Sequence, residues 1–177
     1  EPTQKRIISH KFIIHEGWSP LFLTADIALI ELPEEIEFNE HIQPIALPCH
    51  SDLENTLVGE QATVSGWGKD SDKATAVSPV LRQVSSEIIS RRWCTIPYFG
   101  MISKNHVCIR GKGGKGACSG DSGGPLVGKK ANGQKVQYGV VSFGIAFGCE
   151  LGWPSVFTRV SSYVKWINRK TGIPICD

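Results

Sequence analysis

CSGDSGGPL, residues 118–126, places Ser122 inside a cluster of glycines. Glycine on both sides lets the backbone turn sharply, so the hydroxyl points outward and neighbouring amide N–H groups aim at a common point. That arrangement suits a nucleophile with an oxyanion hole beside it. The alternative is an ordinary glycine turn before a strand, and the length of the Gly-Asp-Ser-Gly-Gly-Pro-Leu string argues against it. The stretch therefore indicates nucleophilic chemistry at Ser122.

The composition is that of one globular domain with a core of its own. The chain has 177 residues, of which 41% are hydrophobic and 20% are charged. Its 19 basic and 17 acidic residues are mixed along the sequence and give a net charge of +2. No basic stripe predicts nucleic-acid binding, and the apolar stretches are too short to span a bilayer. We expect neither nucleic acid nor a membrane as a partner.

Six cysteines are present, and none forms a Cys-x-x-Cys pair. No His/Cys spacing is typical of zinc, so the sequence predicts no metal and no cofactor. An even number of widely spaced cysteines favours disulfides, and hence a secreted protein in an oxidising compartment. Free buried thiols in a cytosolic protein are the alternative.

Short β-like runs separated by glycine and proline dominate the chain, which predicts an all-β antiparallel sandwich or barrel. Asn132-Gly133 between two such runs is typical of a hairpin turn. The expected strands are 25–32, 61–67, 81–89, 107–109, 125–127, 136–141 and 155–160.

The C-terminal segment, residues 161–177, predicts an amphipathic helix followed by a tail. Ser161 or Ser162 can cap its start, Val164 and Ile167 share one face, and Gly172 signals its end. Such a helix packs on the body of a domain, so we interpret it as structural.

Segments along nearly the whole chain resemble the chymotrypsin-like serine peptidases, and in detail the insect and crustacean digestive branch that includes brachyurin-like members. The resemblance implies a double Greek-key antiparallel β-barrel, with the last strands of the first barrel and a linker in 1–45, the complete second barrel in 46–160, and the C-terminal α-helix and tail in 161–177. The matching segments are Thr24–Ile30, Gln43–Pro48, Ser65–Gly68, Val141–Gly144 and Gly152–Val160.

The resemblance also implies two disulfides, Cys94–Cys108 and Cys118–Cys149. A third family disulfide is absent, because Ala62 and Gly128 occupy the positions of its two cysteines. Cys49 and Cys176 either pair with each other or reach a separate chain, and both alternatives stay open.

In this family serine attacks, histidine moves the proton and aspartate orients the histidine. The resemblance assigns the nucleophile to Ser122, the orienting acid to Asp26, and the oxyanion hole to the N–H groups of Gly120 and Ser122. The alternative for Asp26 is a structural carboxylate. The family's Ala-Ala-His-Cys segment is absent, and the chain's own histidines are expected to be surface or loop residues: His10, His15, His41, His50 and His106.

Three explanations of the missing histidine are open: the larger chain of a nicked two-chain enzyme, a truncated chain, or a non-catalytic homologue that binds proteins. Intact Ser122 and Asp26 favour the first. The expected partners are an N-terminal companion chain with the histidine, protein or peptide substrates, and proteinaceous inhibitors. The α-amino group of that companion would pair with Asp121. The family implies a secreted zymogen with a digestive or collagenolytic role.

The primary substrate pocket is expected to be apolar. The resemblance places its floor at Gly116, next to Ala117, with Ser155 at the base and Ser119 at the mouth. It also implies that Tyr98 and Phe157 pack behind the pocket, and that Glu150 faces solvent. An uncharged pocket selects aromatic or aliphatic side chains over Arg and Lys. An extended substrate would add as a strand along Ser142, Phe143 and Gly144, with Leu23 in the adjoining subsite.

Overall fold

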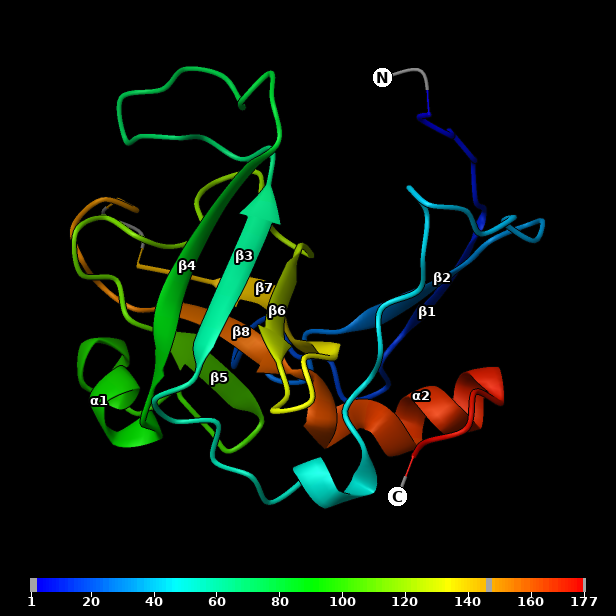
Figure 1. The fold of residues 1–177 in the computed structure, drawn as a ribbon. Helices are drawn as coiled ribbons and strands as arrows, with labels where there is room; N and C mark the ends of the chain where they lie inside the picture. Colours follow the sequence, from blue (N-terminus) through cyan, green and yellow to red (C-terminus); the bar gives the residue numbers. More distant parts are fainter. Residues whose placement is uncertain (1–2, 146–147, 177) are drawn as a thin grey trace.

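Six antiparallel strands close into a barrel in the order β3-β4-β5-β8-β7-β6 (Figure 1). The computed structural model describes residues 3–145 and 148–176. The closed barrel confirms the predicted all-β class, and each strand begins and ends within a few residues of its expected range. The strands are β3 (Gln61–Gly66), β4 (Arg82–Ile89), β5 (His106–Ile109), β6 (Pro125–Lys129), β7 (Lys135–Phe143) and β8 (Ser155–Arg159).

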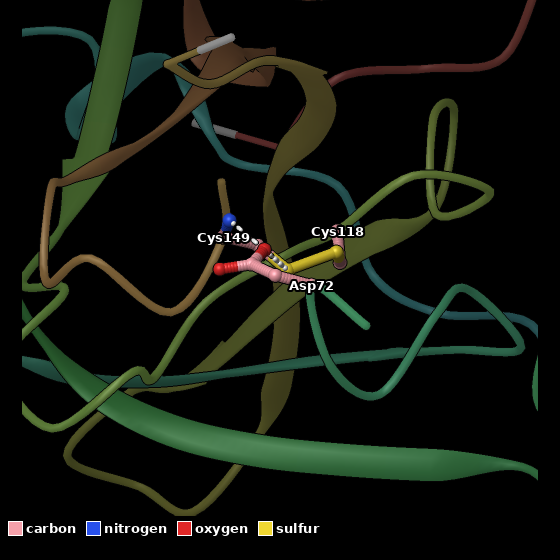
Figure 2. A group of neighbouring side chains, drawn as sticks. All are labelled: Asp72, Cys118 and Cys149. Atoms are coloured by element: carbon pink, nitrogen blue, oxygen red, sulfur yellow. Dashed lines mark hydrogen bonds between the residues drawn. A yellow bond between two sulfur atoms is a disulfide. The ribbon is translucent and has the colours of Figure 1, made fainter. Parts of the chain in front are cut away.

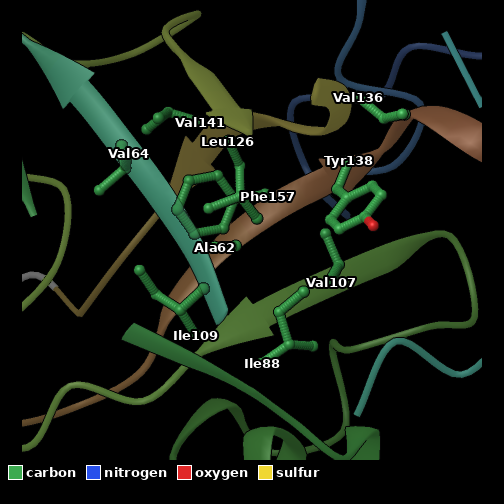
Figure 3. Packing of buried hydrophobic residues seen from close by; sticks show 10 residues of the cluster. All are labelled: Ala62, Val64, Ile88, Val107, Ile109, Leu126, Val136, Tyr138, Val141 and Phe157. Atoms are coloured by element: carbon green, nitrogen blue, oxygen red, sulfur yellow. The ribbon is translucent and has the colours of Figure 1, made fainter. Parts of the chain in front are cut away.

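The barrel interior is filled by side chains from every strand (Figure 3). Phe157 of β8 lies at its centre, fully buried, and a Cβ atom at Gly139 would come within 2.8 Å of the Phe157 Cβ. Burial of each large apolar side chain contributes about 1.5–3 kcal/mol, so this cluster stabilises the closed sheet. The cluster comprises Ala62, Val64, Ile88, Val107, Ile109, Leu126, Val136, Tyr138, Val141 and Phe157.

A separate two-stranded sheet precedes the barrel and lies beside it, next to the C-terminal helix (Figure 1). It pairs β1 (Lys11–Ile14), which the sequence did not predict, with β2 (Ala28–Glu31), which is shorter than expected. Its inner face packs Ile13 and Leu29 against the helix. On its outer face Phe12, Ile14 and Ile30 remain 61%, 61% and 63% exposed.

The predicted C-terminal helix is α2 (Val164–Thr171), preceded by a 3₁₀ turn over Val160–Tyr163. The predicted serine cap is wrong, because no side chain caps the helix and the Ser161 hydroxyl instead accepts a hydrogen bond from Arg159 Nε at 2.8 Å. The predicted stop is correct, since Gly172 adopts φ 74° and its N–H donates to the Asn168 carbonyl.

The remaining helices are short, and the sequence did not predict them. They are α1 (Arg91–Thr95) and the 3₁₀ turns His50–Asp52 and Ile96–Tyr98. No helix in the described part of the chain has the length and hydropathy needed to cross a bilayer.

Three disulfides join all six cysteines. Cys94–Cys108 and Cys118–Cys149 have the pairing that the family resemblance implied. Cys49 pairs with Cys176, which settles the alternative left open by the sequence and links the linker to the C-terminal tail. The Cys49–Cys176 bond closes the longest loop, with a sequence separation of 127 residues, and a disulfide typically contributes about 2–4 kcal/mol.

Gly128→Ala is expected to destabilise the barrel by about 1–3 kcal/mol, because buried overpacking strains neighbouring side chains. A Cβ atom at Gly128 would lie 2.0 Å from the buried Tyr138 ring. The measurement is the melting temperature beside that of Gly144→Ala, where a Cβ meets no atom within 4 Å. Equal melting temperatures for the two variants would contradict the expectation.

Candidate active site

Ser122 lies on an exposed turn between the 110–120 loop and β6. Gly120 and Gly123 flank the turn with φ 100° and 80°, values that L side chains rarely adopt. The turn is closed by the Gly124 N–H, which donates to the Asp121 carbonyl, and by the Gly123 N–H, which donates to the Val141 carbonyl of β7. Ser122 also lines a cleft of about 460 Å³.

Two amide groups beside Ser122 are free to bind a ligand. Within residues 3–145 and 148–176, the backbone N–H groups of Gly120 and Ser122 donate to no acceptor. Both residues are exposed, so the unused donors face solvent at the turn. Paired free N–H donors next to a hydroxyl can stabilise a developing oxyanion.

The Asp121 carboxylate is fixed by backbone amides on two sides. Its Oδ1 accepts from the Gly68 N–H at 2.8 Å, and its Oδ2 accepts from the Cys118 N–H at 2.9 Å. A Cβ atom would come within 2.1 Å of this carboxylate at Gly66 and within 2.5 Å at Gly68, which explains the glycines of the Ser65–Gly68 segment. Asp121 and both glycines line a second cavity of about 300 Å³.

Asp26 is held by two strands of the barrel, although it lies before the barrel in sequence. Its Oδ2 accepts a hydrogen bond from the Ser142 hydroxyl at 2.6 Å, and its carbonyl accepts one from Thr158 Oγ1 at 2.7 Å. The neighbours Ala25 and Ile27 are buried, so the carboxylate is anchored at the edge of the core. A half-buried carboxylate with one bonded oxygen can still accept from another partner.

No histidine completes the constellation in the described part of the chain: none of the five imidazoles bonds to Asp26 or to Ser122. His10 and His41 are exposed, and His15 packs against Trp166 with 4.9 Å between ring centroids. The expectation of a surface or loop residue is wrong for His106, which lies in β5 and is 7% exposed.

Beside Ser122, the cleft brings together most of the predicted pocket residues, namely Ala117, Ser119, Ser142, Phe143, Gly144 and Ser155. Gly116 and Leu23 do not line it. The Ser155 hydroxyl accepts from the Ala117 N–H at 3.0 Å and lies 2.4 Å from the position of a Cβ at Gly116. Ser155 therefore stands between the cleft and Gly116 and closes its base.

Of the two residues expected behind the pocket, Tyr98 lies there and Phe157 does not. Phe157 belongs to the barrel core. The Tyr98 hydroxyl donates to the Pro154 carbonyl, and burial raises the pKa of Tyr98 to about 12. Pro154 lines the cleft, so Tyr98 supports its wall from outside.

Asp72 lies at the cleft, and sequence reasoning missed it. It belongs to the loop between β3 and β4, and its Oδ1 accepts from the Cys149 N–H at 2.7 Å (Figure 2). Glu150 is exposed, as predicted, and its Oε2 accepts from the Asp72 N–H at 2.6 Å. The sequence separation of 77 positions between Asp72 and Cys149 left no local signal of this contact.

Asp72, Cys118 and Cys149 form the single group of three potential metal ligands in the described residues. The two sulfurs are joined in a disulfide and cannot act as thiolates (Figure 2). The group is therefore a structural contact at the cleft wall and does not fit a metal ion.

The Trypsin family model matches residues 1–167 of this chain. This chain belongs to the trypsin family. It is 42% identical over 173 residues to brachyurin from Leptuca pugilator, covering 98% of this chain and 72% of that protein. It is 38% identical to chymotrypsin from Phaedon cochleariae and 38% identical to collagenase from Hypoderma lineatum. These matches cover 94% and 93% of this chain, but only 57% and 61% of those relatives.

A solved structure of HL collagenase has the same trypsin-family fold. It superposes with a TM-score of 0.84 at 37% sequence identity, covering 94% of this chain and 70% of the collagenase chain.

Asp72→Ala is expected to release the cleft wall, because it removes the acceptor of the Cys149 and Glu150 amides. Hydrogen exchange at the Cys149 amide should accelerate by about tenfold, since its net hydrogen bond contributes about 1–1.5 kcal/mol. Asp70→Ala is the matched control, because Asp70 lies on the same loop as Asp72 but pairs with Arg82 of β4. Unchanged exchange at Cys149 would show that the contact is not formed in solution.

Proposed function

We propose that this chain is the catalytic part of a secreted serine endopeptidase that hydrolyses peptide bonds through an acyl-enzyme on Ser122. The observation that carries the proposal is the position of Ser122, exposed at a cleft with two free amide N–H groups beside it. Membership of the trypsin family and the three disulfides support it.

In the proposed reaction Ser122 Oγ attacks the substrate carbonyl carbon while an imidazole takes the hydroxyl proton. The oxyanion accepts hydrogen bonds from the Gly120 and Ser122 N–H groups. The C–N bond then breaks, and the amine leaves with the proton from the imidazolium. Water hydrolyses the ester by the same steps in reverse order and restores the hydroxyl. Asp26 Oδ1, which accepts no bond in the described residues, orients the imidazole while Ser142 holds Oδ2.

We propose further that the imidazole comes from a companion segment, with this chain as the larger chain of a two-chain enzyme. Three observations support this. No described histidine reaches Ser122 or Asp26, and the outer face of the β1–β2 sheet leaves Phe12, Ile14 and Ile30 exposed. A cavity also lies next to the Asp121 carboxylate, where an α-amino group of the companion would find a counter-charge.

The proposed substrates are proteins cleaved after apolar residues. Ala117, Ser155 and Phe143 put no charge into the base of the cleft, and Ser155 shortens it. Ser142 and Phe143 end β7 at the cleft and Gly144 follows them, so an extended peptide could add there as an antiparallel strand, with Leu23 beside it. The similarity to brachyurin and to a collagenase favours a digestive or collagenolytic role, and proteinaceous inhibitors would use the same edge.

A fluorophosphonate is expected to label Ser122 in the purified native protein, companion included, because the reagent phosphonylates only an activated serine hydroxyl. Ser122→Ala should abolish labelling, and Ser85→Ala, which removes an exposed hydroxyl on β4, should leave it unchanged. Intact mass spectrometry of the labelled protein and of its tryptic peptides measures the outcome.

Absence of labelling in protein that contains an Ala-His-Cys companion would overturn the peptidase proposal. It would favour a non-catalytic homologue that binds proteins. Mass spectrometry and N-terminal sequencing of the same sample identify whether the companion is present.

Ser155→Gly is expected to deepen the pocket, because the serine side chain separates the cleft from Gly116. The ratio of kcat/KM for cleavage after Phe to that after Leu should rise by about fivefold or more, since one methylene of pocket space is worth ~1–3 kcal/mol. Substrates with Arg at the same position should remain poor in both proteins. Efficient cleavage after Arg by the unmodified protein would contradict the apolar assignment.

A further inference from the structure

We propose that His106 is a positioning residue that fixes Leu23 and Phe143, the two residues proposed to flank the substrate residues preceding the cleaved bond. The inference rests on the proposed peptidase function and adds a residue to it. His106 is not placed to move protons in the reaction, because it is bonded elsewhere and buried in β5.

The hydrogen bonds of His106 define its tautomer. Nδ1 lies 3.0 Å from the Ser103 backbone nitrogen and accepts its N–H, so Nδ1 carries no proton. Nε2 therefore carries the proton and donates to the Leu23 carbonyl at 3.2 Å. Burial lowers the pKa of His106, which keeps the ring neutral, although the Leu23 bond and the nearby Asp26 charge act in the opposite direction.

His106 works together with Thr158 at one position of the sheet. The two residues are direct partners in the β5–β8 register. His106 holds the carbonyl of Leu23, and Thr158 holds the carbonyl of Asp26. One cross-strand pair of the barrel thus fixes the two ends of the four-residue segment 23–26.

This segment needs external fixing because its backbone is strained. Leu23 and Ala25 have φ 49° and 51°, in the left-handed region that side chains other than glycine rarely occupy. Such conformations persist where the surrounding structure determines them, and they cluster at functional sites. The hydrogen bond from His106 goes to the carbonyl of Leu23, one of these two strained residues.

The same imidazole also supports Phe143, which lines the cleft. Its ring meets the Phe143 ring edge to face, with 5.6 Å between centroids and an interplanar angle of 84°. Tyr98 packs on Phe143 in the same way at 5.4 Å and 88°. Phe143 lines the cleft, so its orientation is set by Tyr98 and His106 together. His106 thus contacts both Leu23 and Phe143.

The role predicts a selective effect on extended substrates. An ester of a single acylated amino acid uses the pocket and Ser122, whereas a tetrapeptide also lies between Leu23 and Phe143. Loss of His106 should therefore raise KM for the tetrapeptide and leave the ester nearly unaffected. A merely structural role would lower activity on both substrates alike.

The experiment compares His106→Leu with the unmodified full protein, companion included. The expected result is a KM for a tetrapeptide amide raised at least fivefold, with kcat within twofold and ester hydrolysis within twofold. His106→Gln, whose side-chain amide can donate to the Leu23 carbonyl, should recover most of the tetrapeptide affinity. His41→Leu, which removes an exposed histidine, should change neither substrate. Equal loss on both substrates, or no change for the tetrapeptide, would overturn the inference.

A readout without substrate separates this inference from the peptidase proposal. Nitrogen NMR of the unmodified protein near neutral pH should show His106 with a protonated Nε2 and an unprotonated Nδ1. The opposite tautomer would overturn the positioning role even in an active enzyme. A protein with the expected tautomer that hydrolyses no ester and takes no fluorophosphonate would instead refute the proposed function.

Discussion

The 2.6 Å hydrogen bond from the Ser142 hydroxyl to Asp26 Oδ2 joins the two parts of the molecule at the site. Removing a carboxylate from water is costly unless hydrogen bonds replace the lost hydration. The Asp26 carboxylate is satisfied by the Ser142 hydroxyl of β7, and the Asp26 carbonyl accepts a hydrogen bond from the Thr158 hydroxyl of β8. Since β7 and β8 are neighbours in a closed barrel, the position of Asp26 is set by the rigid sheet and not by the short β1–β2 ribbon. The geometry between Asp26 and the Ser122 turn follows from this tether.

The Asp121 carboxylate, for its part, holds the Ser122 turn in place. Asp121 spans the gap between the turn and the 65–68 segment by accepting amide hydrogens from both. Glycines at 66 and 68 leave the space that its oxygens occupy, which no larger residue would allow. The orientation of Ser122 therefore depends on the half-buried carboxylate of its neighbour Asp121. The carboxylate in turn faces a cavity that can hold a positive group.

Local patterns in the sequence predicted the barrel strands, the end of α2 at Gly172 and the Ser122 turn, because each depends on neighbouring residues. Contacts between distant segments could not be predicted in the same way. Asp72 reaches the cleft through a loop that bonds to Cys149, and His106 bonds to Leu23 and packs on Phe143, both distant in sequence. The α2 cap failed for a similar reason, since Arg159 takes the Ser161 hydroxyl. β1 was not predicted because it lacks the alternation of apolar and polar residues that is typical of a half-buried strand. Phe12 and Ile14 are apolar although both are exposed.

That outer face is the physical argument for a larger assembly. β1 and β2 pair through only four register positions, and two strands with one uncovered face are marginal in water. Phe12, Ile14 and Ile30 project from adjacent positions, so a covering segment would bury a continuous apolar strip at ~25 cal/mol for each square ångström. The opposite face is already packed against α2 through Ile13 and Leu29. A segment that covers the strip would stiffen β2, which begins two residues after Asp26, while the barrel already holds the Asp26 carboxylate in place through Ser142 and Thr158.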